Sequence, residues 1–123
     1  MQSSLEVFDH DGRLFYQCDG KWLEPLFQLI HHLSQNKTDI SSFILKDKII
    51  GVAAAVLIIQ LGFKKCHGVL MSKKAVNLLE INQVDYSFDE LVNEISCKTE
   101  KMITPDMNLQ TAYIQLLALQ KVK

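Results

Sequence analysis

Apolar and polar residues along this chain follow two patterns, alternation and helical spacing. Alternation over 4–8 and 13–18 predicts two strands, and the Asp11-Gly12 step between them is typical of a hairpin turn. Residues 22–35 instead carry apolar side chains three and four positions apart, which predicts a helix with one apolar face. The chain therefore opens with a hairpin followed by a helix.

The rest of the chain reads as strands followed by helices. Gly62 is predicted to end the second helix and Ser72 to cap the third. No periodicity is visible in Ser96–Thr104, so the pattern leaves the conformation and role of that loop open. The remaining predicted elements are strand 41–45, helix 48–61, strand 64–70, helix 73–81, strand 84–87, a small helix opening at Phe88, and a last helix over 107–121.

This order of elements predicts an α/β fold. Strands that alternate with helices require crossover connections and a largely parallel sheet, to which the hairpin adds an antiparallel pair. We expect a single domain over 1–123 with a five-stranded mixed sheet in a three-layer α/β/α sandwich. No linker or internal repeat divides the chain.

Composition excludes several classes of protein. A net charge of −1 and a pI of about 6.4 do not fit a basic nucleic-acid binder. The uncharged segment 49–63 is shorter than the ~20 residues that span a bilayer, and no signal peptide is predicted. Three widely spaced cysteines without a CxxC motif favour a reduced, cytoplasmic protein. We therefore expect neither nucleic acid nor membrane as a partner.

Three segments carry a resemblance to a known family. They are the hairpin with Asp11-Gly12-Arg13-Leu14, the run from Asp47 to Ala55, and the stretch from Ser72 to Tyr86. Together they resemble a small family of uncharacterised domains, a domain of unknown function, within the cytidine deaminase superfamily. The resemblance implies a cytidine-deaminase-like fold with strand order 2-1-3-4-5.

The chain departs from true deaminases at their metal site. Those enzymes carry His-x-Glu at one helix start and Pro-Cys-x-x-Cys at the next, which together supply three zinc ligands and a proton-shuttling glutamate. Here the two predicted helix starts read Lys21-Trp22-Leu23-Glu24 and Asp47-Lys48-Ile49-Ile50-Gly51, without His or Cys. The adjacent His31 and His32 point about 100° apart on a helix and cannot chelate one ion as an i, i+4 pair would. We expect no metal and no cofactor.

The predicted helix starts suggest an anion site. Lysines stand where acidic residues usually favour the helix dipole, and free N–H groups there attract phosphate or carboxylate. The candidate ligand-binding residues are Asp47, Lys48, Gly51, Ser72 and Lys73. The alternative is structural: Asp47 caps its helix, the lysines are solvated, and Gly51 allows close packing.

Three functions remain open at this point. The first is zinc-free binding of a small anionic metabolite or nucleotide. The second is an enzyme of unknown reaction that uses Asp47 and Lys48, and the third is an interaction module with a decayed site. Trp22 could cover the site or fasten its helix to the sheet, and the run Ala53-Ala54-Ala55 suits either internal packing or a homodimer contact.

Overall fold

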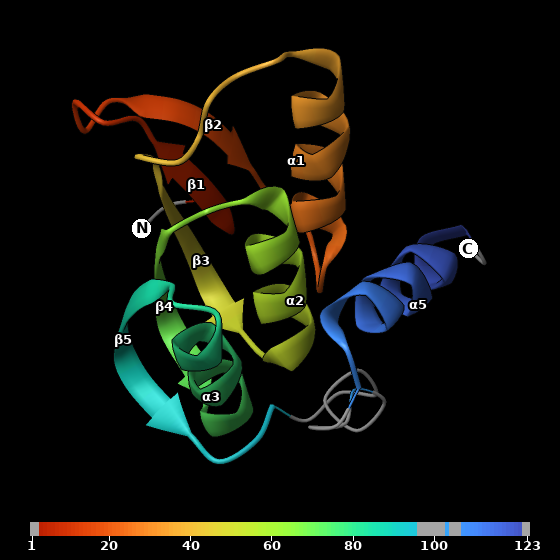
Figure 1. The fold of residues 1–123 in the computed structure, drawn as a ribbon. Coiled ribbons are helices and arrows are strands. Elements are labelled where there is room, and N and C mark those ends of the chain that lie inside the picture. The colour runs from red at the N-terminus through yellow and green to blue at the C-terminus, as the bar shows by residue number, and fades with distance from the viewer. Residues whose placement is uncertain (1–2, 96–102, 104–106, 122–123) are drawn as a thin grey trace.

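The structure is a computed structural model that describes residues 3–95, 103 and 107–121. Its elements alternate much as the sequence predicts (Figure 1). They are β1 (Leu5–Phe8), β2 (Leu14–Cys18), α1 (Glu24–Gln35), β3 (Ile44–Ile50), α2 (Val52–Leu61), β4 (Lys65–Ser72), α3 (Lys73–Ile81), β5 (Asp85–Val92) and α5 (Leu109–Lys121).

The strands form one five-stranded sheet in the order β2-β1-β3-β4-β5. Strand β1 is antiparallel to both β2 and β3, whereas β3, β4 and β5 run parallel. The α/β class and the predicted strand order are therefore confirmed. At the hairpin, Asp9 Oδ1 accepts the backbone N–H groups of Asp11 and Arg13, both at 2.9 Å, and Gly12 adopts a φ of 82°.

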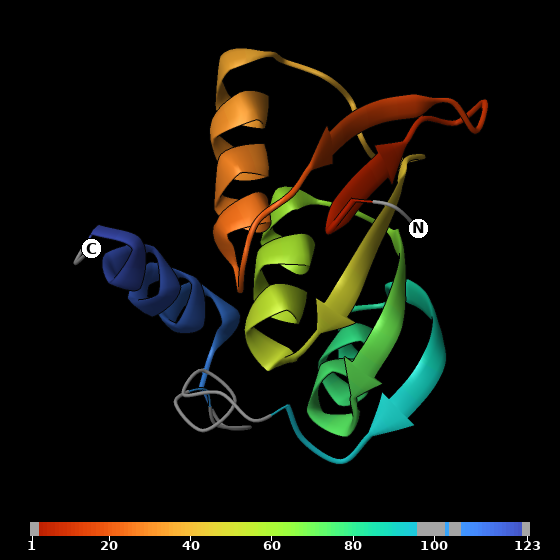
Figure 2. The same cartoon turned by 180° about the vertical axis from the view of Figure 1, so that it is seen from behind.

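The described helices gather on one side of the sheet. Helices α1, α2 and α3 lie along one face, and α5 packs against α2 (Figures 1 and 2). The layering thus differs from a sheet enclosed between two helical layers. Because the crossovers β3-α2-β4 and β4-α3-β5 step in the same direction, their right-handedness places both helices on the same face. Within the described residues, the opposite face of the sheet carries no helix.

The boundary between β3 and α2 corrects the sequence prediction. The predicted strand 41–45 extends to Ile50, and the predicted helix 48–61 begins only at Val52. The strand continues because it pairs on both sides: Asp47 lies opposite Leu5 of β1 and Gly68 of β4. Asp47 and Lys48 are therefore strand residues, and Asp47 does not cap a helix.

The chain after Val84 also differs from the prediction. The small helix expected from Phe88 is absent, because β5 continues to Val92 in parallel register with β4. Helix α3 matches its predicted range, and Gly62 ends α2 with a φ of 98°, as expected. The loop Ser96–Thr104 lies outside the described residues apart from Ile103, which is buried.

Candidate functional site

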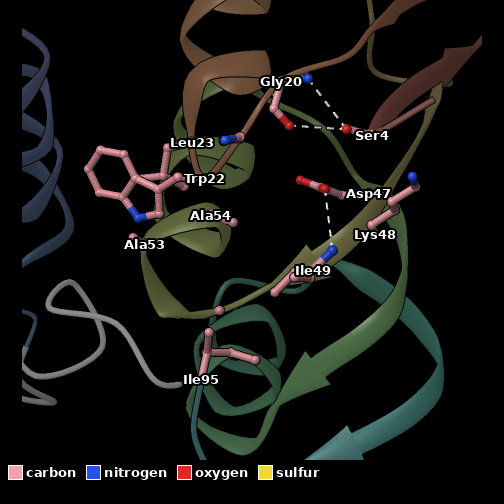
Figure 3. A pocket seen from close by; sticks show the side chains of 12 residues that line it. Ser4, Gly20, Trp22, Leu23, Asp47, Lys48, Ile49, Ala53, Ala54 and Ile95 are labelled. Atoms are coloured by element: carbon pink, nitrogen blue, oxygen red, sulfur yellow. Dashed lines mark hydrogen bonds between the residues drawn. The ribbon is translucent and has the colours of Figure 1, made fainter.

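A cavity of about 340 Å³ opens at the carboxyl end of β3, between the segment that leads into α1 and the first turn of α2 (Figure 3). Its volume lies in the range of small-molecule pockets, roughly 300–1,000 Å³. In open α/β sheets, ligands bind beyond the carboxyl ends of the strands. The lining residues are Ser4, Gly20, Lys21, Trp22, Leu23, Asp47, Lys48, Ile49, Gly51, Ala53, Ala54 and Ile95.

Asp47 brings a carboxyl group to an otherwise largely apolar wall. Its side chain points into the cavity (Figure 3), and its Oδ1 accepts the backbone N–H of Ile49 at 3.4 Å. Burial raises the pKa of Asp47 from 3.8 to about 7, although the backbone N–H groups of Ile49 and Lys48 oppose the shift. The Asp47 carboxyl therefore exchanges its proton near neutral pH.

The strand alternation changes beside this carboxyl. Leu45 and Ile50 are both fully buried although they lie five positions apart, and regular alternation would place them on opposite faces. A Cβ atom on Gly68 would lie 3.2 Å from the side chain of Ile50, so Ile50 reaches the same face as Gly68. Irregularities of this kind re-aim side chains and are frequent next to functional sites.

The second wall comes from the segment before α1, which is fastened to the start of β1. Ser4 Oγ donates to the carbonyl oxygen of Gly20 at 3.1 Å, and the backbone N–H of Ser4 donates to Asp19 Oδ1 at 3.0 Å. Trp22 adopts a φ of 58°, so the helix cannot begin there as predicted and starts at Glu24. The Trp22 ring meets Phe27 edge-to-face at 6.4 Å yet remains 47% exposed, which places it as a partly open apolar wall.

The floor is the first turn of α2. Its N-cap is Gly51, which has no side chain to accept the helix N–H groups, and the first turn contains no acidic residue. Ala53 and Ala54 leave room above this positive end of the helix. The three alanines are at most 2% exposed, so they pack inside the chain, as the first of the two sequence interpretations has it.

The structure brings together three of the five predicted ligand-binding residues. Asp47, Lys48 and Gly51 line the cavity, and the Lys48 side chain points away from the Asp47 carboxyl (Figure 3). Ser72 and Lys73 are absent from this lining. Ser72 is fully buried and caps α3, accepting the backbone N–H of Ala75 at 3.2 Å, which confirms its predicted capping role.

Sequence reasoning missed several of the other residues that line the cavity. Ser4 and Gly20 carry no motif, and Ile95 belongs to a segment that was expected to be helical. The opening Lys21-Trp22 of the first predicted helix was the available signal, since an aromatic residue and a lysine stand together just before a helix.

Neither of the two cysteines that the structure describes lines this cavity. Cys66 is buried, and desolvation together with the nearby Asp47 raises the pKa of its thiol to about 12. Cys18 is half-buried and donates to Gln28 Oε1 at 3.0 Å, and Cys97 lies outside the described residues. Across the part of the chain that the structure describes, no three His, Cys, Asp or Glu side chains gather as metal ligands, and no helix is long and apolar enough to cross a membrane.

Comparison with known proteins identifies relatives of the fold. Residues 4–114 match the family model "TM1506: Domain of unknown function (DUF1893)". The crystal structure of a DUF1893 family protein (TM1506) from Thermotoga maritima is similar, with a TM-score of 0.78 at 22% sequence identity, covering 94% of this chain and 79% of that one. No curated protein sequence matches the chain. At this identity the structural likeness shows the fold alone.

Proposed function

The chain belongs to the DUF1893 family, which has no assigned function, and from its cavity we propose that it binds a small nucleotide-like molecule without zinc. The observation that carries the proposal is the Asp47 carboxyl in a largely apolar cavity that an exposed tryptophan and the open start of α2 also line. A ligand that combines a flat ring, hydrogen-bond donors and an anionic group matches these three surfaces.

The ring of the ligand would pack against the apolar walls. Trp22 offers a half-exposed aromatic face, and Ala53 and Ala54 form a shallow floor across from it. Aromatic side chains bury large areas and prefer stacked or edge-to-face contacts with other rings. A heterocycle that packs against Trp22 would bury one of its faces there.

Polar groups divide between the depth and the rim of the cavity. Asp47 can accept amino or hydroxyl donors of the ligand when it is ionised. Lys21 and Lys48 are exposed and border the same cavity, so they can meet an anionic group at the rim. The N–H groups of the first turn of α2 add a second positive surface. This arrangement supports the nucleotide and anion expectation with Asp47, Lys48 and Gly51, joined by Lys21 in place of Ser72 and Lys73.

The resemblance to cytidine deaminases supports the same location. The cavity lies between the starts of α1 and α2, where the resemblance implies that a deaminase would hold its zinc ligands. In this chain α1 is preceded by Lys21-Trp22-Leu23, and α2 opens with Gly51-Val52-Ala53. We infer a site of deaminase-like position whose chemistry is binding by shape, charge and hydrogen bonds.

Calorimetry and thermal shift with CMP, AMP, cytidine and inorganic phosphate test the proposal. At least one nucleotide should raise the Tm, and phosphate alone should bind more weakly. Lys48→Ala should weaken binding by about threefold, as expected for an exposed ion pair, and Trp22→Ala by about tenfold or more. Lys73→Ala is the matched control, since Lys73 is an exposed lysine outside the cavity, and it should leave affinity unchanged. Absence of a shift with all four compounds, or equal losses in both lysine variants, would contradict this site.

An enzyme is the second candidate, and the raised pKa of Asp47 favours it. A carboxyl group with a pKa near 7 is suited to exchange protons in general acid–base catalysis. An enzyme would show turnover that Asp47→Asn abolishes while substrate still binds. Retained turnover in that variant would exclude Asp47 as the acid–base group, and binding without turnover would support the binding domain.

A further inference from the structure

A row of polar residues crosses the sheet face opposite the helices. Neighbouring strands pair Gln17 with Glu6, Glu6 with Lys46, Lys46 with His67, and His67 with Ser87. Laterally paired residues project from the same face of a sheet. The row therefore brings a carboxylate, an ammonium group, an imidazole and a hydroxyl group side by side, away from the cavity around Asp47.

Three members of this face form a connected triad. His67 Nδ1 lies 2.6 Å from Ser87 Oγ, and His67 Nε2 lies 3.2 Å from Asp89 Oδ1. Asp89 is two residues beyond Ser87 on β5, so both side chains project toward the same imidazole of β4. The His67 side chain is 26% exposed and that of Asp89 63%, so the triad is open to solvent and to a reactant.

The two contacts, a hydrogen bond to Ser87 and an ion-pair contact with Asp89, decide the role of each imidazole nitrogen. A carboxylate can only accept, so Asp89 selects the neutral tautomer in which Nε2 carries the proton. Nδ1 is then an acceptor, and the Ser87 hydroxyl donates to it. A hydroxyl nucleophile, a neutral imidazole base and an orienting carboxylate are the three groups of serine acyl transfer, which is defined by geometry and roles rather than by fold.

We propose that Ser87, His67 and Asp89 form an acyl-transfer site that takes small activated esters from solution. Ser87 Oγ attacks the acyl carbon, its proton passes to His67 Nδ1, and the bond from the acyl carbon to the leaving oxygen breaks as that oxygen takes the proton from His67. Water then attacks the Ser87 ester with His67 as base, which releases the carboxylic acid and restores the serine. Asp89 is a positioning residue that holds the imidazole and its charge.

Lys46 adds a positive charge beside the triad. It is the lateral neighbour of His67, and its Nζ lies 5.0 Å from the centre of the Phe8 ring. Phe8 belongs to β1, so this contact holds the ammonium group on the side of β3 that faces away from His67 and Ser87, and the transfer step does not use it.

Covalent labelling with a fluorophosphonate tests the site directly. Ser87 Oγ forms a bond to phosphorus while fluoride leaves and His67 takes the proton, and the adduct is located by mass spectrometry of peptides. We expect labelling on Ser87 and slow hydrolysis of p-nitrophenyl acetate. Ser87→Ala should abolish both, and His67→Gln should slow labelling by about 100-fold, the lower end for general-base assistance.

Control variants show whether the labelling depends on this triad. Ser42→Ala alters another exposed serine, outside the triad, and should label normally. Asp89→Asn should slow labelling because its amide no longer orients the imidazole as the carboxylate does, and the conservative Asp89→Glu should restore much of the rate; an unchanged rate in Asp89→Asn would show that Asp89 does not position His67. Absence of an adduct on Ser87, or labelling that is unaffected by His67→Gln, would overturn the proposal.

Discussion

Replacing Asp47 with asparagine removes the ionisable group from the cavity while keeping the side-chain shape and the oxygen that accepts from Ile49. In the unfolded chain this carboxyl ionises near 3.8, whereas burial raises its pKa in the folded protein to about 7. Between these values the native state keeps a proton that the unfolded state has lost. The free energy of unfolding therefore falls as pH rises from 4 to 7, and the loss is complete above 7.

The size of this loss follows from the shift in pKa. A difference of about three pH units corresponds to at most about 4 kcal/mol, at 1.36 kcal/mol per unit. The Asp47 carboxyl borders an open cavity that admits water, so we expect about half of that, roughly 2 kcal/mol. Asp47→Asn should thus match the wild type near pH 4 and exceed its stability by roughly 2 kcal/mol at pH 8.

Urea denaturation of both proteins from pH 2.5 to pH 8.5 measures the difference. Asp39→Asn is a control of opposite sign, because the pKa of exposed Asp39 is lowered by the backbone N–H of Ser41. That variant should be less stable than the wild type at neutral pH and should approach it as the pH falls through the acidic range. Parallel curves for the wild type and Asp47→Asn would refute the desolvated carboxyl and with it the acid–base candidate.

Two further predictions concern the framework of the site. Ser72→Ala removes the cap of α3 and should cost about 1 kcal/mol by urea denaturation without changing nucleotide affinity; a loss of affinity would return Ser72 to the ligand site. Gly68→Ala places a Cβ 3.2 Å from the Ile50 side chain and 3.1 Å from the carbonyl oxygen of Leu70, and should lower the free energy of unfolding by about 1–2 kcal/mol. Adding Ile50→Val should reduce this loss. If it does not, the contact with the Leu70 backbone is the main cause.

Local sequence patterns predicted most of the fold, because turns and helix ends depend on residues close together in the chain. The Asp11-Gly12 turn, the Gly62 stop and the Ser72 cap each depend on a residue's own conformational preference or side-chain hydrogen bond, and all three are in place. The strand β5 was misread because Phe88, Leu91 and Val92 have helical spacing as well as strand composition. Pairing with β4, a contact between residues distant in sequence, decides between the two.

The candidate site was predicted only in part for the same reason. Asp47 and Lys48 look like the start of a helix when the sequence is taken alone, and only their pairing with Leu5 and Gly68 makes them strand residues. The segment from Gly20 to Leu23 is held beside the cavity by hydrogen bonds between Ser4 and the residues Asp19 and Gly20. No local sequence pattern indicates these bonds. Residues that meet through tertiary contacts have no signature in one sequence.

The boundary between β3 and α2 lies later in the chain than the sequence predicts, and this changes the chemistry of the site. At a helix start, Asp47 would accept backbone N–H groups in water and remain an ordinary ionised cap. Within a central strand, the same carboxyl is desolvated between β1 and β4 and carries a pKa of about 7. The α2 start keeps its positive end uncapped, since Gly51 brings no side chain to it. A carboxyl that gains its proton near neutral pH and an uncapped helix end therefore share one cavity. The affinity of this cavity for an anion should rise as Asp47 becomes neutral. Its affinity for a ligand that donates an amino group should instead rise as Asp47 ionises.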